Sequence, residues 1–154
     1  MKPGTFTQIY IQLVFSPMNR QCLLQKNIRP RVFEYISGII TNLGHKSIIV
    51  NGIADHVHLF IGMNPNLSVS DTVKEIKRAS SLFINENRLT PGKFQWQHGY
   101  GGFSYSRSHI EKVYDYILNQ EEHHKKKTFR EEYLDFLKKY EISFEDQYLF
   151  EFFE

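Results

Sequence analysis

Apolar and polar residues alternate along several short stretches of the chain, which is typical of β-strands with one buried face. The alternation is clearest over residues 5–15, where every second residue from Ile9 to Phe15 is apolar. Two such stretches, 46–54 and 55–63, follow one another directly and predict a hairpin or another close pairing. The strands expected from this pattern span residues 5–15, 46–54, 55–63, 94–96 and 103–105.

Apolar residues recur every three or four positions in four longer stretches, as on the buried face of an amphipathic helix. Gly44 stands where the first helix should end, because glycine readily adopts the left-handed conformation of a helix terminus. Ser68 with Asp71, and Ser108 with Glu111, have the spacing of capping boxes at the start of the second and third helices. The predicted helices span residues 28–43, 68–87, 108–124 and 129–140.

The order of these elements is strand, helix, strand, strand, helix, strand or hairpin, helix. Short connections in this order favour an α+β, ferredoxin-like sandwich, in which helices pack on one face of a mainly antiparallel sheet. Because domains typically hold ~100–200 residues, residues 1–154 are predicted to form a single domain. The aromatic C-terminal tail, residues 141–154, is expected to pack on this domain or on a partner.

Composition restricts the environment of the protein more than its activity. The 19 Lys and Arg residues exceed the 17 Asp and Glu residues by two, and this balance alone does not indicate a polyanionic partner. Cys22 is the only cysteine, so a disulfide framework is excluded. No apolar run approaches the ~18 residues of a membrane span and no signal-peptide pattern opens the sequence, so a soluble cytoplasmic protein without membrane partners is expected.

The most informative short motif is His56-Val57-His58 in the predicted strand 55–63. Residues two apart on a strand point to the same face, so the two imidazoles project together, ~6.6 Å apart along the strand. Val57 then faces the core. Such a pair can hold a metal ion, or it can be two histidines that happen to share a solvated face. Asp55 can orient one of them or serve only the turn.

Tyr116 and Gln120 lie four residues apart in the third predicted helix and are therefore neighbours on its surface. Helical spacing places Tyr114 within the apolar arc of this helix and Tyr116 to one side of it. Gln120 offers a carbonyl oxygen to a cation. A tyrosine half buried at a helix border is the alternative interpretation of Tyr116.

Three motifs together resemble the insertion-sequence-200-like transposases, a single-tyrosine family with a His-hydrophobic-His motif. In the order of the family, the motifs are Asp55-His56-Val57-His58, residues 94–104 and residues 116–125. The resemblance covers nearly the whole chain. It implies a ferredoxin-like fold and a homodimer with composite active sites, in which the tyrosine helix can come from the opposite subunit.

The resemblance also implies functional roles for four residues. His56, His58 and Gln120 would bind a divalent metal ion, Mg²⁺ or Mn²⁺, and Tyr116 would attack DNA. The expected reaction cleaves and rejoins single-stranded DNA, at hairpin-forming element ends, through a 5′-phosphotyrosine intermediate. Imidazole and amide ligands suit Mn²⁺ better than Mg²⁺, so we expect Mn²⁺ to support the reaction at least as well.

Two basic clusters could hold DNA. Lys74, Lys77 and Arg78 share one face of the second predicted helix, and Lys125 and Lys126 follow the third. A solvated charged face is the alternative for the first cluster. Aromatic residues near the glycine-rich stretch could stack on unpaired bases or belong to the core; they are Trp96, Tyr100, Phe103 and Tyr105.

The sequence therefore predicts a metal-dependent DNA transposase. Two alternatives stay open: a non-catalytic module that binds single-stranded nucleic acid, and a His-x-His metal-dependent hydrolase. Among the remaining histidines, His109 is the one expected to matter, because it lies close to Tyr116 on the helix surface.

Overall fold

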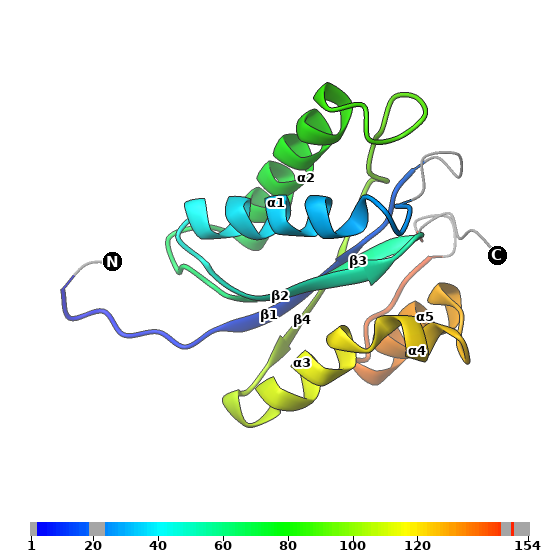
Figure 1. Ribbon diagram of the computed structural model, residues 1–154. Helices are drawn as coiled ribbons and strands as arrows, with labels where there is room; N and C mark the ends of the chain where they lie inside the picture. Colours follow the sequence, from blue (N-terminus) through cyan, green and yellow to red (C-terminus); the bar gives the residue numbers. More distant parts are fainter. Residues whose placement is uncertain (1–2, 19–23, 146–148, 150–154) are drawn as a thin grey trace.

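The structure is a computed structural model that describes residues 3–18, 24–145 and 149. A four-stranded sheet forms its centre, with strand order β2-β3-β1-β4 and every neighbouring pair antiparallel. Two helices connect the strands in a βαββαβ order (Figure 1). These elements are β1 (Tyr10–Phe15), α1 (Arg29–Asn42), β2 (Lys46–Ile53), β3 (His56–Gly62), α2 (Val69–Glu86) and β4 (Gly101–Tyr105). The predicted α+β fold, ferredoxin-like with an antiparallel sheet, is confirmed.

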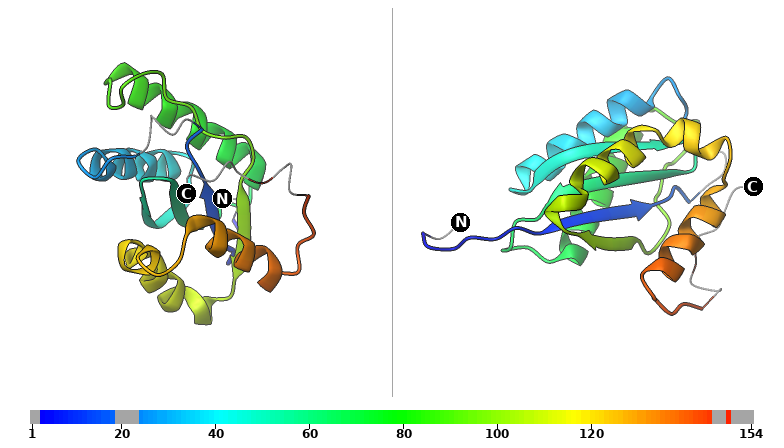
Figure 2. Two further views of the ribbon diagram at one scale, coloured as in Figure 1. Left: turned by 90° about the vertical axis from the view of Figure 1, so that its right-hand side faces the viewer. Right: turned by 90° about the horizontal axis from the view of Figure 1, so that it is seen from below.

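Helices cover both faces of the sheet, whereas the pattern predicted helices on one face. The pair α1 and α2 lies on one face, and three shorter helices lie on the other (Figures 1 and 2). These are α3 (Ile110–Leu118), α4 (Gln120–His124) and α5 (Phe129–Lys139). The reason is visible in β3, whose residues from His56 to Ile61 are all buried, so neither side of this strand can face water.

Most of the larger core cluster lies between the sheet and the helices α1 and α2, and the cluster also includes three residues of α5. Leu13, Leu59 and Ile61 from the two central strands pack there with Val32 of α1 and Ile76 of α2. A Schellman motif ends α1, since the His45 N–H donates to the Ile40 carbonyl and the Gly44 N–H to that of Thr41. Gly44 has a φ of 85°, as its predicted role at the helix terminus requires.

The second cluster lies on the opposite face and is smaller. Phe60 of β3 packs there against Val113 and Ile117 of α3. Beside it, Phe103 of β4, a member of the larger cluster, stacks on Phe136 of α5 with ring centroids 5.0 Å apart. The C-terminal helices therefore rest on the sheet through a few apolar contacts, which surround the polar groups described below.

The third predicted helix is divided in the structure. A 3₁₀ turn (Arg107–His109) precedes α3, and Asn119, with ψ at 27°, separates α3 from α4. The capping box predicted at Ser108 is absent, because its hydroxyl contacts Ser106 and His109 instead of a backbone N–H. The cap predicted at Ser68 forms, since its side chain accepts from the Asp71 N–H at 3.0 Å.

Other predictions differ at the edges of the fold. Residues 94–96 form no strand, because Trp96 makes only an isolated bridge with Pro17. The first strand begins at Tyr10 rather than near residue 5. Of the predicted aromatic tail, Phe144 is exposed, whereas residues 146–148 and 150–154 lie outside the described residues. None of the described helices is long and apolar enough to cross a membrane.

Candidate active site

The two histidines of the His-x-His motif meet on the inner side of the C-terminal helices. His56 and His58 are fully buried, and their rings lie edge to face with centroids 4.9 Å apart. Val57 points to the opposite face and belongs to the larger core cluster. The alternation of the strand therefore does what the sequence predicts, and the histidines do not share a solvated face.

Asp55 and Gln120 fix the orientation of the first imidazole. His56 Nδ1 lies 2.8 Å from Asp55 Oδ1, and His56 Nε2 lies 3.0 Å from Gln120 Oε1. Of the two roles open to Asp55, the contact with the histidine is the one observed. A carboxylate beside Nδ1 is common for the histidine ligands of metal sites, in which the other ring nitrogen faces the ion.

A buried carboxylate joins the site from α5. Glu132 Oε1 lies 2.8 Å from His58 Nε2 and 3.5 Å from His56 Nε2, and Glu132 Oε2 lies 3.0 Å from His124 Nε2. Burial would raise the pKa of Glu132, but the surrounding imidazoles, His58 first, hold this pKa well below its usual range. Glu132 is therefore ionised inside the protein.

Sequence reasoning missed Glu132 and His124, although one signal was available. Glu132 stands three residues after Phe129 and one before Tyr133, on the apolar stripe of the predicted helix 129–140. A carboxylate on an apolar stripe needs a buried partner. His124 was left unassigned, since its position at the end of a predicted helix carries no such signal.

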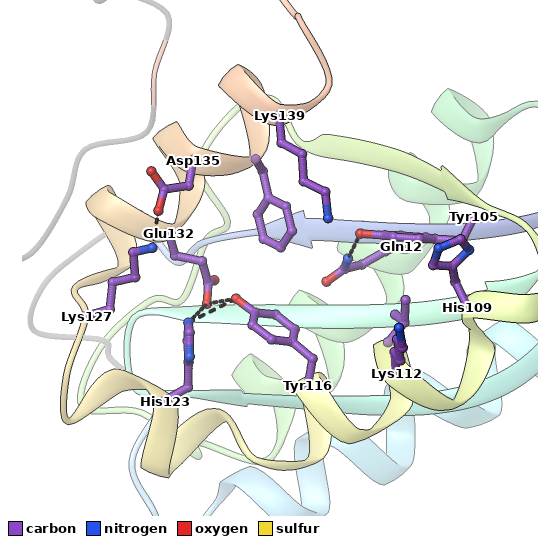
Figure 3. Close-up of a pocket in the computed structure, with 12 residues that line it drawn as sticks. Gln12, Tyr105, His109, Lys112, Tyr116, His123, Lys127, Glu132, Asp135 and Lys139 are labelled. Atoms are coloured by element: carbon purple, nitrogen blue, oxygen red, sulfur yellow. Dashed lines mark hydrogen bonds and ion pairs between the residues drawn. The ribbon is translucent and has the colours of Figure 1, made fainter.

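Tyr116 reaches the same carboxylate from α3. Its hydroxyl donates to Glu132 Oε2 and lies 3.2 Å from His123 Nε2 (Figure 3). Burial, followed by the negative charge of Glu132, raises the pKa of Tyr116 well above its usual range. Tyr114, predicted to lie in the core, is exposed, because the buried stripe of α3 runs through Val113 and Ile117 toward Gln120.

A cavity of about 310 Å³ opens beside Tyr116 and Glu132. Cationic side chains gather on its walls: Lys112, Lys127 and Lys139. His109 also lines it. Lys127 pairs with Asp135, and Lys112 and Lys139 outnumber Glu132, so the lining carries a small net positive charge. Such a cavity suits a phosphate group.

The predicted DNA-binding residues of α2 are not part of this site. Lys74, Lys77 and Arg78 belong to a helix on the other face of the sheet (Figure 2). The Lys77 amine donates to the carbonyls of Gln97 and Gly99 at 2.8 and 2.6 Å, and burial lowers its pKa to about 8. Arg78 forms a double hydrogen bond with Glu75.

The second basic cluster and the aromatic residues are placed differently. Lys125 and Lys126 are exposed directly after α4, and Lys125 pairs with Glu122 at 2.8 Å. Of the four aromatic residues near the glycine-rich stretch, Trp96 and Phe103 are buried in the core and Tyr105 is partly buried. Tyr100 is the one with an exposed ring.

The donor atoms fit a divalent metal ion. One ligand atom from each of His56, His58, His124 and Glu132 lies within 4.8 Å of all the others. Gln120 Oε1 stands at the border of this group, 3.1 Å from His124 Nε2. Imidazole nitrogens and carboxylate oxygens are ligands that first-row transition metals accept.

Comparisons with known proteins agree with this arrangement. The family model described as "Transposase IS200 like" matches residues 5–120, and no curated protein sequence matches the chain. A crystal structure of a putative transposase from Deinococcus radiodurans R1 shares 22% identity at a TM-score of 0.62, covering 78% of this chain and 96% of that one. The REP-associated tyrosine transposase bound to a REP hairpin shares 13% identity at a TM-score of 0.58, with coverages of 80% and 74%. These likenesses show the fold, and the family match shows that the chain belongs to the IS200-like transposases.

Proposed function

We propose that this transposase cleaves and rejoins single-stranded DNA, with Tyr116 as the nucleophile. The observation that carries the proposal is the position of the Tyr116 hydroxyl, which lies in a cationic cavity and shares Glu132 with the buried histidines. A tyrosine that only stabilised the fold would not need a cavity lined by lysines beside it. The family membership of the chain supports the same activity.

In the proposed reaction the scissile phosphate enters the cavity near Lys112 and Lys139. The Tyr116 oxygen forms a bond to phosphorus, the bond from phosphorus to the 3′ oxygen breaks, and that oxygen leaves as a 3′-hydroxyl. The products are a 5′-phosphotyrosine and a free 3′ end, and a later attack by a 3′-hydroxyl reverses the chemistry. No external energy source is needed.

The raised pKa of Tyr116 shapes this step. The hydroxyl stays protonated at neutral pH, so its proton must leave while the bond to phosphorus forms. The hydrogen bond to Glu132 orients the hydroxyl, and the lysines lower the cost of bringing a phosphate close to this carboxylate. A divalent metal ion, Mg²⁺ or Mn²⁺, held by His56, His58 and Gln120 would neutralise phosphate charge.

The partners belong to the same proposal. Single-stranded DNA from hairpin-forming element ends is the expected substrate, and the fold is shared with a transposase that binds a REP hairpin. A homodimer with composite active sites stays a prediction. Within one chain the Tyr116 hydroxyl contacts Glu132, and Glu132 contacts His58.

The test is covalent capture of DNA. The protein is incubated with single-stranded DNA from either flank of its own gene, with Mn²⁺ or with chelator, and resolved on a denaturing gel. We expect an adduct with wild type and with Tyr114→Phe, whose ring is exposed on the same helix. Tyr116→Phe and the chelated sample should give none while still shifting DNA on a native gel.

Binding without any adduct, for either strand and any metal, would favour a non-catalytic single-stranded nucleic-acid-binding module. An adduct that persists in Tyr116→Phe would assign the nucleophile elsewhere. Hydrolysis products without a covalent intermediate would favour the metal-dependent hydrolase.

A further inference from the structure

Two side chains approach the His-x-His pair from the part of the chain beyond the family match, which ends at residue 120. His124 ends α4 and Glu132 lies in the first turn of α5. Their side chains are 5% and 2% exposed, so both are withdrawn from water. The helices α4 and α5 thus deliver one imidazole and one carboxylate to a place that already holds two imidazoles.

The spacing of these donors matches the size of a coordination sphere. Glu132 oxygens lie 2.8 Å from His58 Nε2, 3.5 Å from His56 Nε2 and 3.0 Å from His124 Nε2. Bonds of ~2.0–2.1 Å to a tetrahedral ion place neighbouring donors roughly 3.3 Å apart. The four groups therefore need only small adjustments to surround one ion.

The side-chain contacts of the cluster point the same way. Three imidazoles surround the carboxylate of Glu132, and each of them turns its Nε2 atom toward a carboxylate oxygen. Three imidazoles and one carboxylate offer enough donors to replace most of the hydration shell of a divalent cation.

We propose that His124 and Glu132 are direct metal ligands together with His56 and His58, giving a centre of three histidines and one carboxylate. The inference rests on the proposed function, because it concerns the metal ion of the same site. In this centre His124 and Glu132 take the place given above to Gln120, which lies beside the set in contact with the imidazoles of His56 and His124.

This ligand set predicts which ions support the reaction and which ions inhibit it. Mn²⁺ and Co²⁺ accept six ligands, so four protein donors leave positions for a phosphate oxygen and water. Zn²⁺ prefers four ligands, and a site with four protein donors is closed to substrate. Mg²⁺ binds weakly to a nitrogen-rich set. Zn²⁺ should therefore displace Mn²⁺ and inhibit, although the same residues hold both.

The experiment measures metal binding without DNA. The full chain is titrated with Mn²⁺, followed by the electron paramagnetic resonance signal of the free ion, and with Co²⁺, followed by its visible absorption. We expect one site in wild type, and at least ~10-fold weaker binding with altered Co²⁺ bands in Glu132→Gln and His124→Gln, since both lose a ligand. One equivalent of Zn²⁺ should release the bound Mn²⁺.

Glu34→Gln and His98→Gln are the matched controls, because both residues are exposed and lie outside the cluster. Both should bind like wild type. The inference is overturned if Glu132→Gln and His124→Gln bind Mn²⁺ and Co²⁺ like wild type while His56→Gln does not. If circular dichroism shows Glu132→Gln to be unfolded, His124→Gln alone decides.

The adduct assay with Tyr116→Phe keeps the two proposals separate. Weakened metal binding in the variants together with no wild-type adduct would overturn the proposed function and leave this metal centre standing. A normal adduct together with unchanged metal binding in both variants would support the proposed function and overturn this metal centre.

Discussion

Buried histidines of this protein differ in their hydrogen bonds, and the difference separates a structural imidazole from those of the site. His45 Nδ1 accepts from the Asn64 N–H at 2.8 Å, and its Nε2 lies 2.9 Å from the Thr72 hydroxyl. Both nitrogens are satisfied by neutral partners, so the ring is held uncharged. His56, in contrast, contacts the carboxylate of Asp55 with its Nδ1 atom.

We expect His45→Gln to flatten the pH dependence of stability. Burial lowers the pKa of His45 below its ordinary value near 6.5, so the unfolded chain binds this proton more readily than the folded protein does. The contribution of neutral His45 is complete above about pH 6.5 and is lost as the pH falls from there toward the lowered pKa. Urea unfolding at several pH values between 5 and 7.5 measures it.

Glutamine keeps an acceptor and a donor but does not titrate in this range. Other histidines affect both proteins alike, so the difference between the two unfolding curves isolates His45. A difference that does not change between pH 7.5 and 5 would show that His45 has the same pKa in both states.

Single residues also show what the sequence can and cannot reveal about the site. The pairing of His56 with His58 was predictable, because a strand fixes the direction of its side chains. That Tyr114 would be exposed and Tyr116 would point inward was not predictable, since both lie near the border of the apolar arc. Glu132 lies 76 positions beyond His56, and only the packing of α5 on the sheet brings the two together.

At the scale of elements, the start of α5 positions Glu132. Thr128 forms a complete capping box with Glu131, which fixes the first turn of the helix that carries this carboxylate. The division between α3 and α4 at Asn119 was missed, because the apolar period continues through it. Its cause is local, as the Asn119 side chain donates to the Asp115 carbonyl at 2.8 Å and ends the helix.

We predict that Thr128→Ala weakens both the helix and the metal site. Loss of a cap costs ~1 kcal/mol, which is about 2–4 °C in Tm for a domain of this size. The first turn then frays and Glu132 leaves its partners more often, so Mn²⁺ affinity falls as well. Thermal unfolding followed by circular dichroism and Mn²⁺ titration measure the two effects.

Ser68→Ala is the control for this prediction. It removes the corresponding cap of α2, which lies on the other face of the sheet. It should lower Tm by a similar amount and leave Mn²⁺ affinity unchanged. Equal losses of affinity in both variants would mean that overall stability, rather than the cap of α5, governs the site.

For the whole molecule, the sheet divides the protein into two layers of unequal packing. The larger cluster joins the sheet to α1 and α2 and also includes three residues of α5, whereas the smaller one joins the sheet to α3. The βαββαβ order was predictable from sequence periods alone. The covering of the second face by helices was not predictable, since this covering follows from the burial of both sides of β3.

We expect amide hydrogen exchange to follow these layers. Amides of the central strands β1 and β3 should exchange slowest, and those of α4 much faster, because local opening needs less energy where less apolar surface is buried. Mn²⁺ should slow exchange in α4 and α5 and leave α1 and α2 unchanged. Uniform protection, or equal slowing in all helices, would contradict this picture. Mass spectrometry of peptic fragments resolves the segments.

The two oxygens of Glu132 have different neighbours, and this links the binding of an ion to the position of the tyrosine. One oxygen faces the histidine pair of β3, while the other receives the hydrogen bond of Tyr116. An ion bound beside the histidines acts on the same carboxylate that orients the tyrosine hydroxyl. Ion binding and the position of the proposed nucleophile are therefore coupled through one side chain.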